Sequence, residues 1–309
     1  MFRRLVALLM ALLPVSAAAQ TAPVVIAHRG ASGLAPENTL AAFRKAIGAG
    51  ADGMEFDVHL SADGHVVVHH DFTLKPEIAR LDGEWLAAEG PALRTLTLVE
   101  LRRYDVGRLR PGTAYARRYP DQQPADGARI PTLDEVLALV RDTAPADFQL
   151  WIELKLDPTK PAVSSDPDTL ADAVVSAVQG AGMEARSTAI SFHWPALYRI
   201  QRMAPGIRTG YLSAQRDWLD NIRTGQPGPS PWTAPLDVDD HGSIPRAIHA
   251  AGGAAWSVYI GDLTPAALRE ARALGLQVGV WTVRRKDEAA LARSLVPDVV
   301  TTDRPDWYR

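Results

Sequence analysis

Polar and charged side chains follow several apolar runs of this sequence, at the point where each run ends. Residues two apart in a strand point to the same side, so Glu55 and Asp57 are expected to share one face. The same spacing groups Glu153 with Lys155. The pattern predicts that carboxylates, cations and imidazoles converge where the strands end. These residues are His28, Arg29, Glu55, Asp57, His70, Asp71, Glu153, Lys155 and Asp303.

Three of these acids, Glu55, Asp57 and Glu153, would lie close together in a mostly buried place. Buried carboxylates need compensating charge, because an isolated ion is very unfavourable away from water. A hard divalent cation with oxygen ligands is the simplest compensation. The alternative is a structural cluster, in which the neighbouring lysine and arginine pair with the acids. The two histidines nearby favour a functional site over that alternative.

The remaining polar residues fit phosphoryl transfer. His28 and His70 suit a general acid and a general base, because imidazole changes protonation near neutral pH. Arg29 and Lys155 suit an anionic substrate such as a phosphate ester. A glycosidase would need two carboxylates without this cationic pair. The Gly-x-Ser-x-Gly element of many serine hydrolases is absent from the sequence.

The elements that must position these residues alternate along the chain. Short runs rich in Val, Ile and Leu are followed by helical stretches rich in Ala, Leu and Arg, which predicts an α/β protein with a (β/α)8 barrel. The alternative is a doubly wound open sheet, but no Gly-x-Gly-x-x-Gly follows the first run. The predicted strands are Val24–His28, Met54–Val58, Gln149–Lys155, Thr188–Phe192, Arg208–Leu212, Ala255–Tyr259, Gln277–Val283 and Val299–Thr302.

Two features interrupt the alternation. Val66–His70 follows the second run too closely for a parallel crossover, so the two should form an antiparallel hairpin. If Leu60 pairs with His65, Glu55 faces His70. The segment 71–147 is too long for an ordinary loop. We therefore predict that it forms a small, mainly helical subdomain inserted after the hairpin.

The first residues resemble an export signal. Residues 1–19 combine two arginines, an apolar run and small residues before a predicted cleavage after Ala19, which would leave 20–309 as the barrel domain. Their removal takes away two arginines and no acids, so the net charge changes from −3 to −5. That charge gives no reason to expect nucleic acid as a partner. The chain has no cysteine for a lipid or a disulfide. We therefore expect a periplasmic or secreted protein without a stable membrane anchor.

An ordered set of motifs resembles the glycerophosphodiester phosphodiesterase family. Each motif is weak alone, but together they run in order from residue 24 to residue 306. They are Ala-His-Arg-Gly at 27–30, Ala-Pro-Glu-Asn-Thr-Leu at 35–40, Glu-Phe-Asp-Val at 55–58, His-Asp at 70–71, Ile-Glu-Leu-Lys at 152–155, Ser-Phe at 191–192, Trp-Thr-Val at 281–283 and Thr-Asp-Arg-Pro at 302–305.

The resemblance implies a phosphatidylinositol-phospholipase-C-like barrel that hydrolyses glycerophosphodiesters to glycerol 3-phosphate and an alcohol. It also implies roles for matching positions. The acid/base pair would be His28 and His70, the ligands of Ca²⁺ or Mg²⁺ would be Glu55, Asp57 and Glu153, the phosphate contacts would be Arg29 and Lys155, and the aromatic wall beside the glycerol would be Trp281.

Two other functions stay open at this point. One is a related phosphodiesterase such as a lysophospholipase D, which a long apolar groove near the inserted subdomain would favour. The other is a non-catalytic periplasmic binding module, which the loss of a histidine or a metal-binding acid would have indicated. The chain departs from the family at Arg284, where asparagine is usual, and at His59, which is expected to point away from the metal.

Overall fold

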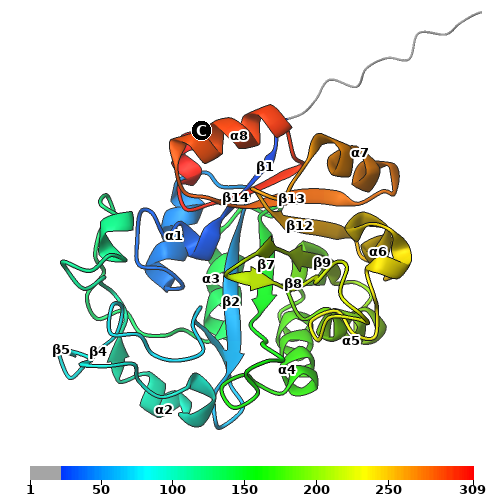
Figure 1. The fold of residues 1–309 in the computed structure, drawn as a ribbon. Helices are drawn as coiled ribbons and strands as arrows, with labels where there is room; N and C mark the ends of the chain where they lie inside the picture. Colours follow the sequence, from blue (N-terminus) through cyan, green and yellow to red (C-terminus); the bar gives the residue numbers. More distant parts are fainter. Residues whose placement is uncertain (1–21) are drawn as a thin grey trace, which may run out of the picture.

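The computed structural model describes residues 22–309, so the predicted export signal lies outside the described residues. A barrel of eight parallel strands forms the centre of the molecule, and helices surround it (Figure 1). This arrangement confirms the predicted (β/α)8 barrel, and each strand matches a predicted run within two residues at either end. The barrel strands are β1 (Val24–Ala27), β2 (Gly53–Leu60), β7 (Gln149–Leu154), β8 (Ser187–Ser191), β9 (Arg208–Ser213), β12 (Ala255–Tyr259), β13 (Gln277–Val283) and β14 (Val299–Thr302).

The barrel closes because β1 pairs on both sides. Val24 pairs with Val299 of β14, and Ile26 pairs with Gly53 of β2, both in parallel. A Cβ atom at Gly53 would lie 2.5 Å from the carbonyl oxygen of Gln149, so this tight junction requires glycine. Parallel closure brings the carboxyl ends of all eight strands to one mouth, which is where such barrels carry their active sites.

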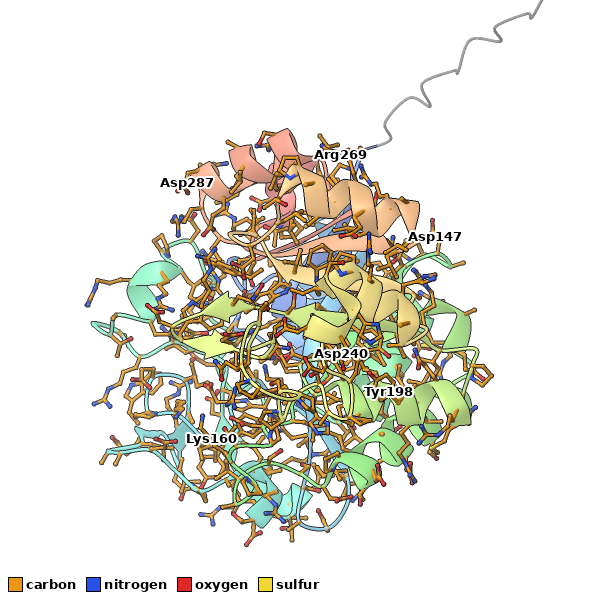
Figure 2. All side chains as sticks on the ribbon, turned by 45° about the vertical axis from the view of Figure 1, so that its right-hand side comes forward. Asp147, Lys160, Tyr198, Asp240, Arg269 and Asp287 are labelled. Atoms are coloured by element: carbon orange, nitrogen blue, oxygen red, sulfur yellow. The ribbon has the colours of Figure 1, made fainter. Side chains whose placement is uncertain are left out.

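Amphipathic helices cover the outside of the barrel. In α7 the side chain of Leu268 is buried against the barrel, whereas Arg269 is exposed. Arg269 and Asp287 are labelled on the outer helical layer in Figure 2. No helix of residues 22–309 combines the length and apolarity that a bilayer crossing requires. The outer helices are α1 (Leu40–Gly48), α3 (Leu133–Thr143), α4 (Pro167–Gly180), α5 (Trp194–Met203), α6 (Ile244–Ala250), α7 (Pro265–Ala273) and α8 (Lys286–Leu295).

The predicted hairpin is present, but its register differs by one residue from the prediction. β2 extends past β1 and pairs with the antiparallel β3 (Val66–Val68), in the register Leu60 with Val66. The predicted partner of Leu60 was His65. The backbone carbonyl of His65 instead accepts a hydrogen bond at 2.9 Å from the backbone N–H of Ser61. The loop therefore has three residues and ends at Gly64, whose φ of 83° suits a bulged hairpin turn.

The segment after β3 forms a small subdomain with its own core. Leu74, Leu93 and Ile130 pack there against Val67 of β3. The predicted range of the subdomain, 71–147, also includes α3. This helix packs against α1, α4 and β3 and therefore belongs to the barrel. The rest of the segment contains short strands as well as short helical turns, which refines the prediction of a mainly helical subdomain. Its elements are β4 (Arg80–Leu81), β5 (Glu84–Trp85), α2 (Leu98–Leu101) and β6 (Tyr104–Asp105).

Candidate active site

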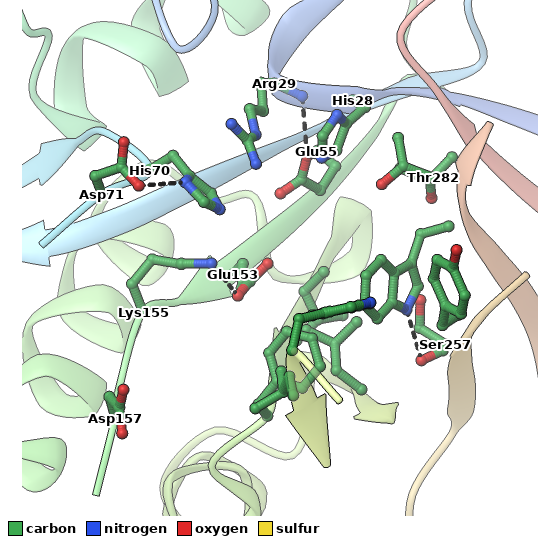
Figure 3. A pocket seen from close by; sticks show the side chains of 18 of the residues that line it. His28, Arg29, Glu55, His70, Asp71, Glu153, Lys155, Asp157, Ser257 and Thr282 are labelled. Atoms are coloured by element: carbon green, nitrogen blue, oxygen red, sulfur yellow. Dashed lines mark hydrogen bonds and ion pairs between the residues drawn. The ribbon is translucent and has the colours of Figure 1, made fainter. Parts of the chain in front are cut away.

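A cavity of about 630 Å³ opens at the carboxyl ends of the barrel strands. Seven of the eight residues to which the family resemblance assigns a role line it, and Figure 3 shows most of them pointing into it. The eighth, Asp57, is buried beside them and only 1% exposed. The fold therefore brings the predicted residues together. The seven are His28, Arg29, Glu55, His70, Glu153, Lys155 and Trp281.

The turn after β1 positions two of these residues at once. Arg29 and Gly30 both have positive φ, at 49° and 75°. A Cβ at Gly30 would lie 2.3 Å from Cδ1 of Phe43, so only glycine fits this turn. The turn directs the backbone N–H of Arg29 to Oε2 of Glu55, to which it donates at 2.9 Å. The Ala-His-Arg-Gly segment thus holds a carboxylate as well as presenting its own side chains.

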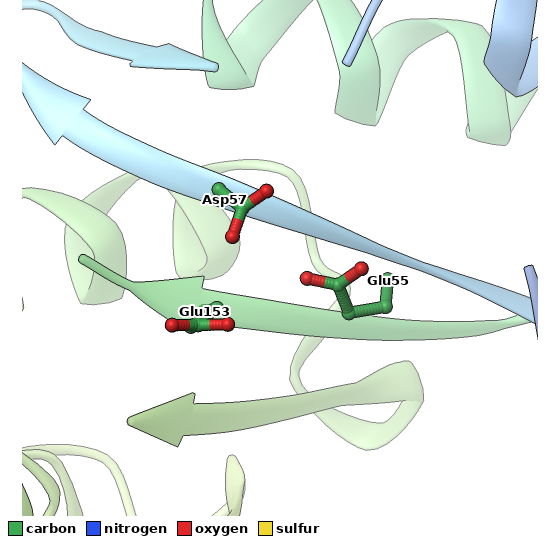
Figure 4. A group of neighbouring side chains, drawn as sticks. All are labelled: Glu55, Asp57 and Glu153. Atoms are coloured by element: carbon green, nitrogen blue, oxygen red, sulfur yellow. The ribbon is translucent and has the colours of Figure 1, made fainter. Parts of the chain in front are cut away.

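The three acids form one cluster on two neighbouring strands (Figure 4). Asp57 of β2 pairs in register with Glu153 of β7, and Glu55 lies two residues earlier on the same face of β2. One oxygen of each carboxylate lies within 4.8 Å of the others. Oε1 of Glu55 is buried and has no hydrogen-bond partner in the described part of the chain. An orphaned carboxylate oxygen among hard oxygen donors fits a divalent cation such as Ca²⁺ or Mg²⁺.

The surroundings act differently on the charge of each of the three acids. Burial raises the pKa of Glu55 well above its usual range, and the nearby Asp57 and Glu153 raise it further. Burial likewise raises the pKa of Glu153 to about 7, although Lys155 opposes the shift. Burial also acts on Asp57, but Lys155, His70 and Arg29 outweigh it and hold its pKa well below the usual range. A bound cation would favour the ionised form of all three acids.

His28 is held by a carboxylate from the far end of the chain. Its Nδ1 lies 2.6 Å from Oδ1 of Asp303, and the Ser32 hydroxyl donates to the same oxygen at 2.8 Å. Burial opposes the ionised form of Asp303, but the charge and the hydrogen bond of His28, together with Arg284 and Ser32, outweigh it and lower the pKa of Asp303. An ionised carboxylate can only accept, so Nδ1 carries the proton. Nε2 is then the free nitrogen, and it lies 3.9 Å from Oε2 of Glu55.

His70 has a similar partner. Its Nδ1 lies 3.1 Å from Oδ1 of the adjacent Asp71. Burial lowers the pKa of His70 to about 4, and the positive charges of Arg29 and Lys155 contribute. The buried His59 donates from Nε2 to the backbone carbonyl of His70 at 3.2 Å, so it supports the segment that carries His70. Two histidine–carboxylate pairs therefore face one cavity.

The two predicted phosphate-binding cations border the acidic cluster. Nη1 of Arg29 donates to Oε1 of Glu37 at 2.8 Å, while its Nε lies 3.7 Å from Asp57 and has no hydrogen-bond partner among residues 22–309. Nζ of Lys155 donates to Glu153 at 2.7 Å and lies 3.4 Å from Asp57. Both cations are thus fixed by acids and stay close enough to the cavity to meet an anionic substrate.

Several residues of the site were not predicted to act there. Asn38, which has a φ of 55°, donates to Asp57 at 2.8 Å. Tyr115 of the inserted subdomain contacts Arg29 and hydrogen-bonds Glu37. Glu37 and Asn38 follow the first strand, so their position in a βα loop was a usable signal. Nothing in the local sequence around Tyr115 marks it, because the insertion brings it to the cavity.

Five aromatic rings that line the cavity form a continuous surface, here called the aromatic wall. Phe192 lies 5.4 Å from Trp281, ring centre to ring centre, and Tyr259 lies 5.6 Å from Trp281. Nε1 of Trp281 donates to the carbonyl of Ser257 at 3.0 Å, which fixes the central ring. The register between β13 and β14 shifts after Val280, just before this ring. The wall consists of Phe192, Trp218, Trp232, Tyr259 and Trp281.

The barrel and the residues at its mouth define an enzyme class: a (β/α)8 hydrolase that acts on phosphate esters. The sequence profile of the "Glycerophosphoryl diester phosphodiesterase family" matches residues 28–307. The chain therefore belongs to the glycerophosphoryl diester phosphodiesterase family.

Individual proteins agree with this assignment. A glycerophosphodiester phosphodiesterase of Caldanaerobacter subterraneus subsp. tengcongensis is 30% identical and covers 92% of this chain and 95% of its own. A crystal structure from Silicibacter pomeroyi DSS-3, assigned to the same family, is 36% identical with a TM-score of 0.81, over 93% and 92% of the two chains. An Oleispira antarctica phosphodiesterase, solved with the product sn-glycerol-3-phosphate, shares the fold at 24% identity and a TM-score of 0.66, over 93% and 95%.

Proposed function

We propose that this enzyme uses a divalent cation and two histidines to hydrolyse glycerophosphodiesters to glycerol 3-phosphate and an alcohol such as choline or ethanolamine. The observation that carries the proposal is the convergence of two histidine–carboxylate pairs, three acids and two cations on one cavity. The Oleispira antarctica neighbour was solved with a product of this kind, which supports the substrate class.

In the proposed mechanism, Arg29 and Lys155 bind the phosphodiester oxygens. One histidine accepts the proton of the nucleophile, which is water or the 2-hydroxyl of the glycerol. The other donates a proton to the oxygen of the leaving alcohol as its bond to phosphorus breaks. Asp303 and Asp71 keep the Nδ1 atoms of His28 and His70 engaged, so that each Nε2 is available to the substrate.

The cation would be held by Glu55, Asp57 and Glu153. When bound, it supplies positive charge at the phosphate oxygens.

We further propose that the enzyme acts in the periplasm or outside the cell. The export-like composition of residues 1–19 supports this location.

A direct assay tests the proposed function. We expect purified enzyme to release glycerol 3-phosphate from glycerophosphocholine and glycerophosphoethanolamine with Ca²⁺ or Mg²⁺. A chelator should lower the rate about a hundredfold or more, since a metal contributes several kcal/mol and about 1.4 kcal/mol is a factor of ten. Full activity in the presence of the chelator would show that the mechanism uses no metal. No turnover of any glycerophosphodiester with either metal would overturn the proposed function.

The acidic cluster also predicts a thermal effect that does not depend on turnover. Adding Ca²⁺ or Mg²⁺ at about 100 times its Kd should stabilise the fold by about 2.7 kcal/mol and raise the melting midpoint by about 5 °C. Glu55→Gln should remove most of that shift, because it takes away a ligand charge. Glu84→Gln, an exposed position in β5, is the matched control and should keep the shift. Equal shifts of the melting midpoint in the wild type and in both variants would show that the cation binds elsewhere.

A further inference from the structure

Tyr115 joins the inserted subdomain to the phosphate-binding side of the cavity. It lies at the start of the helical turn η3 (Ala116–Arg118), and its side chain lines the cavity together with Arg118 and Tyr119. The ring of Tyr115 packs edge-on against that of Tyr119, with the ring centres 5.4 Å apart, and the guanidinium of Arg118 lies 5.8 Å from the centre of the Tyr115 ring. The packing of its own segment therefore holds the hydroxyl of Tyr115 at the cavity.

The segment that carries Tyr115 is also bonded to the loop after β1. The backbone N–H of Gln123 donates to the carbonyl of Leu34 at 2.9 Å. The loop continues to Glu37, which is buried and accepts a hydrogen bond from the Tyr115 hydroxyl. Burial and the charge of Glu37 raise the pKa of Tyr115 well above its usual range, so the hydroxyl stays protonated and remains a donor to the carboxylate.

Glu37 and Tyr115 together use both N–H groups of one guanidinium nitrogen. Nη1 of Arg29 donates to Oε1 of Glu37 at 2.8 Å and to the hydroxyl of Tyr115 at 3.3 Å. A terminal guanidinium nitrogen carries two hydrogens, so Nη1 has none left for a substrate. Because the hydroxyl accepts from Arg29 while it donates to Glu37, the three side chains form a closed cycle of hydrogen bonds.

The opposite edge of the same guanidinium is open. Within residues 22–309, Arg29 hydrogen-bonds other side chains only through Nη1, and its Nε is buried without a partner. Nε lies 3.7 Å from Oδ2 of Asp57, which is beyond hydrogen-bond distance. The N–H groups of Nε and Nη2 point the same way and match two oxygens of a phosphate. The bonds to Nη1 fix the rotation of the guanidinium and therefore the direction of this edge.

We propose that Tyr115 is a positioning residue for the phosphodiester. Together with Glu37 it fixes Nη1 of Arg29, so that the Nε–Nη2 edge is presented to two oxygens of the substrate phosphate. The inserted subdomain thus completes the phosphate site. The inference rests on the proposed function, in which Arg29 binds the phosphodiester.

Tyr115→Phe tests this inference, because it keeps the ring and removes only the hydroxyl. Arg29 would hold the phosphate in the bound substrate as well as in the transition state, so we expect KM for glycerophosphocholine to rise about tenfold while kcat changes less than about threefold. The Kd of inorganic phosphate, measured by calorimetry with saturating Mg²⁺, should rise by the same factor. Tyr104→Phe, the loss of a hydroxyl in the core of the same subdomain, is the matched control and should change neither KM nor Kd.

A double-mutant cycle separates positioning of Arg29 from an independent effect of Tyr115. Lysine presents a single ammonium with no edge to orient, so Tyr115→Phe should raise KM and Kd less than about twofold in an Arg29→Lys background. An equal rise of KM and Kd in both backgrounds would show that Tyr115 acts independently of Arg29, and it would overturn the inference.

Two further results would also contradict the inference. One is an unchanged KM and Kd in Tyr115→Phe. The other is a fall in kcat alone, which a structural defect produces. If the wild type hydrolyses no glycerophosphodiester, the proposed function is wrong, and the Kd of phosphate in the wild type and in the Tyr115 and Arg29 variants still tests the role of Tyr115.

Discussion

Replacing His70 or His28 with alanine is expected to lower kcat on glycerophosphocholine about a thousandfold. Proton transfer by a positioned side chain contributes about 10² to 10⁴ in rate, and the proposed mechanism needs one transfer at each histidine. Both rings line the cavity, and each has Nδ1 engaged by a carboxylate. Steady-state rates with saturating Ca²⁺ or Mg²⁺ provide the measurement.

The two variants should differ in stability. The side chain of His70 is 28% exposed, so its removal should leave the melting midpoint nearly unchanged. His28→Ala takes a partner away from the buried Asp303, and the free energy of unfolding should fall by about 1–3 kcal/mol. His65→Ala, at the exposed hairpin turn, is the control and should keep normal rates. Near-normal turnover in both His28→Ala and His70→Ala would show that the mechanism is wrong.

Asp303→Asn is expected to lower kcat about a thousandfold with little change in KM. The carboxylate keeps the proton of His28 on Nδ1 and stabilises the charged imidazolium. An amide at this position can donate to Nδ1, which moves the proton to Nε2, and a comparable change in a catalytic triad costs about 10⁴ in kcat. The protonated nitrogen of His28, observed by ¹⁵N NMR, should change together with the rate.

Ser32→Ala provides the matched control for Asp303. Its hydroxyl donates to the same carboxylate oxygen at 2.8 Å, whereas its bond to His28 is made by the backbone N–H, which the substitution keeps. Its loss should lower kcat less than about tenfold, because a typical hydrogen bond contributes about 1 kcal/mol. If Ser32→Ala costs as much as Asp303→Asn, or if Asp303→Asn keeps the Nδ1 proton and most of the rate, Asp303 does not position His28 for catalysis.

Much of the fold and of the site could be predicted because it depends on local spacing. Strands buried on both faces are continuous apolar runs, so the eight barrel strands were visible in the sequence. The shared face of Glu55 and Asp57 follows from strand geometry, and the structure confirms their convergence with Glu153. The hairpin register was wrong by one residue, because the loop length depends on the turn that Ser61 and Gly64 adopt.

The sequence by itself thus determined the barrel and the chemical types at its mouth, since both are encoded in short, regular patterns. Only the tertiary structure decided which groups meet across long separations. Asp303 reaches His28 over 275 positions because barrel closure makes β14 the neighbour of β1. Tyr115 and Trp218 arrive at the cavity on an inserted segment and an added hairpin. Their placement depends on how those segments pack, and no local periodicity encodes such packing.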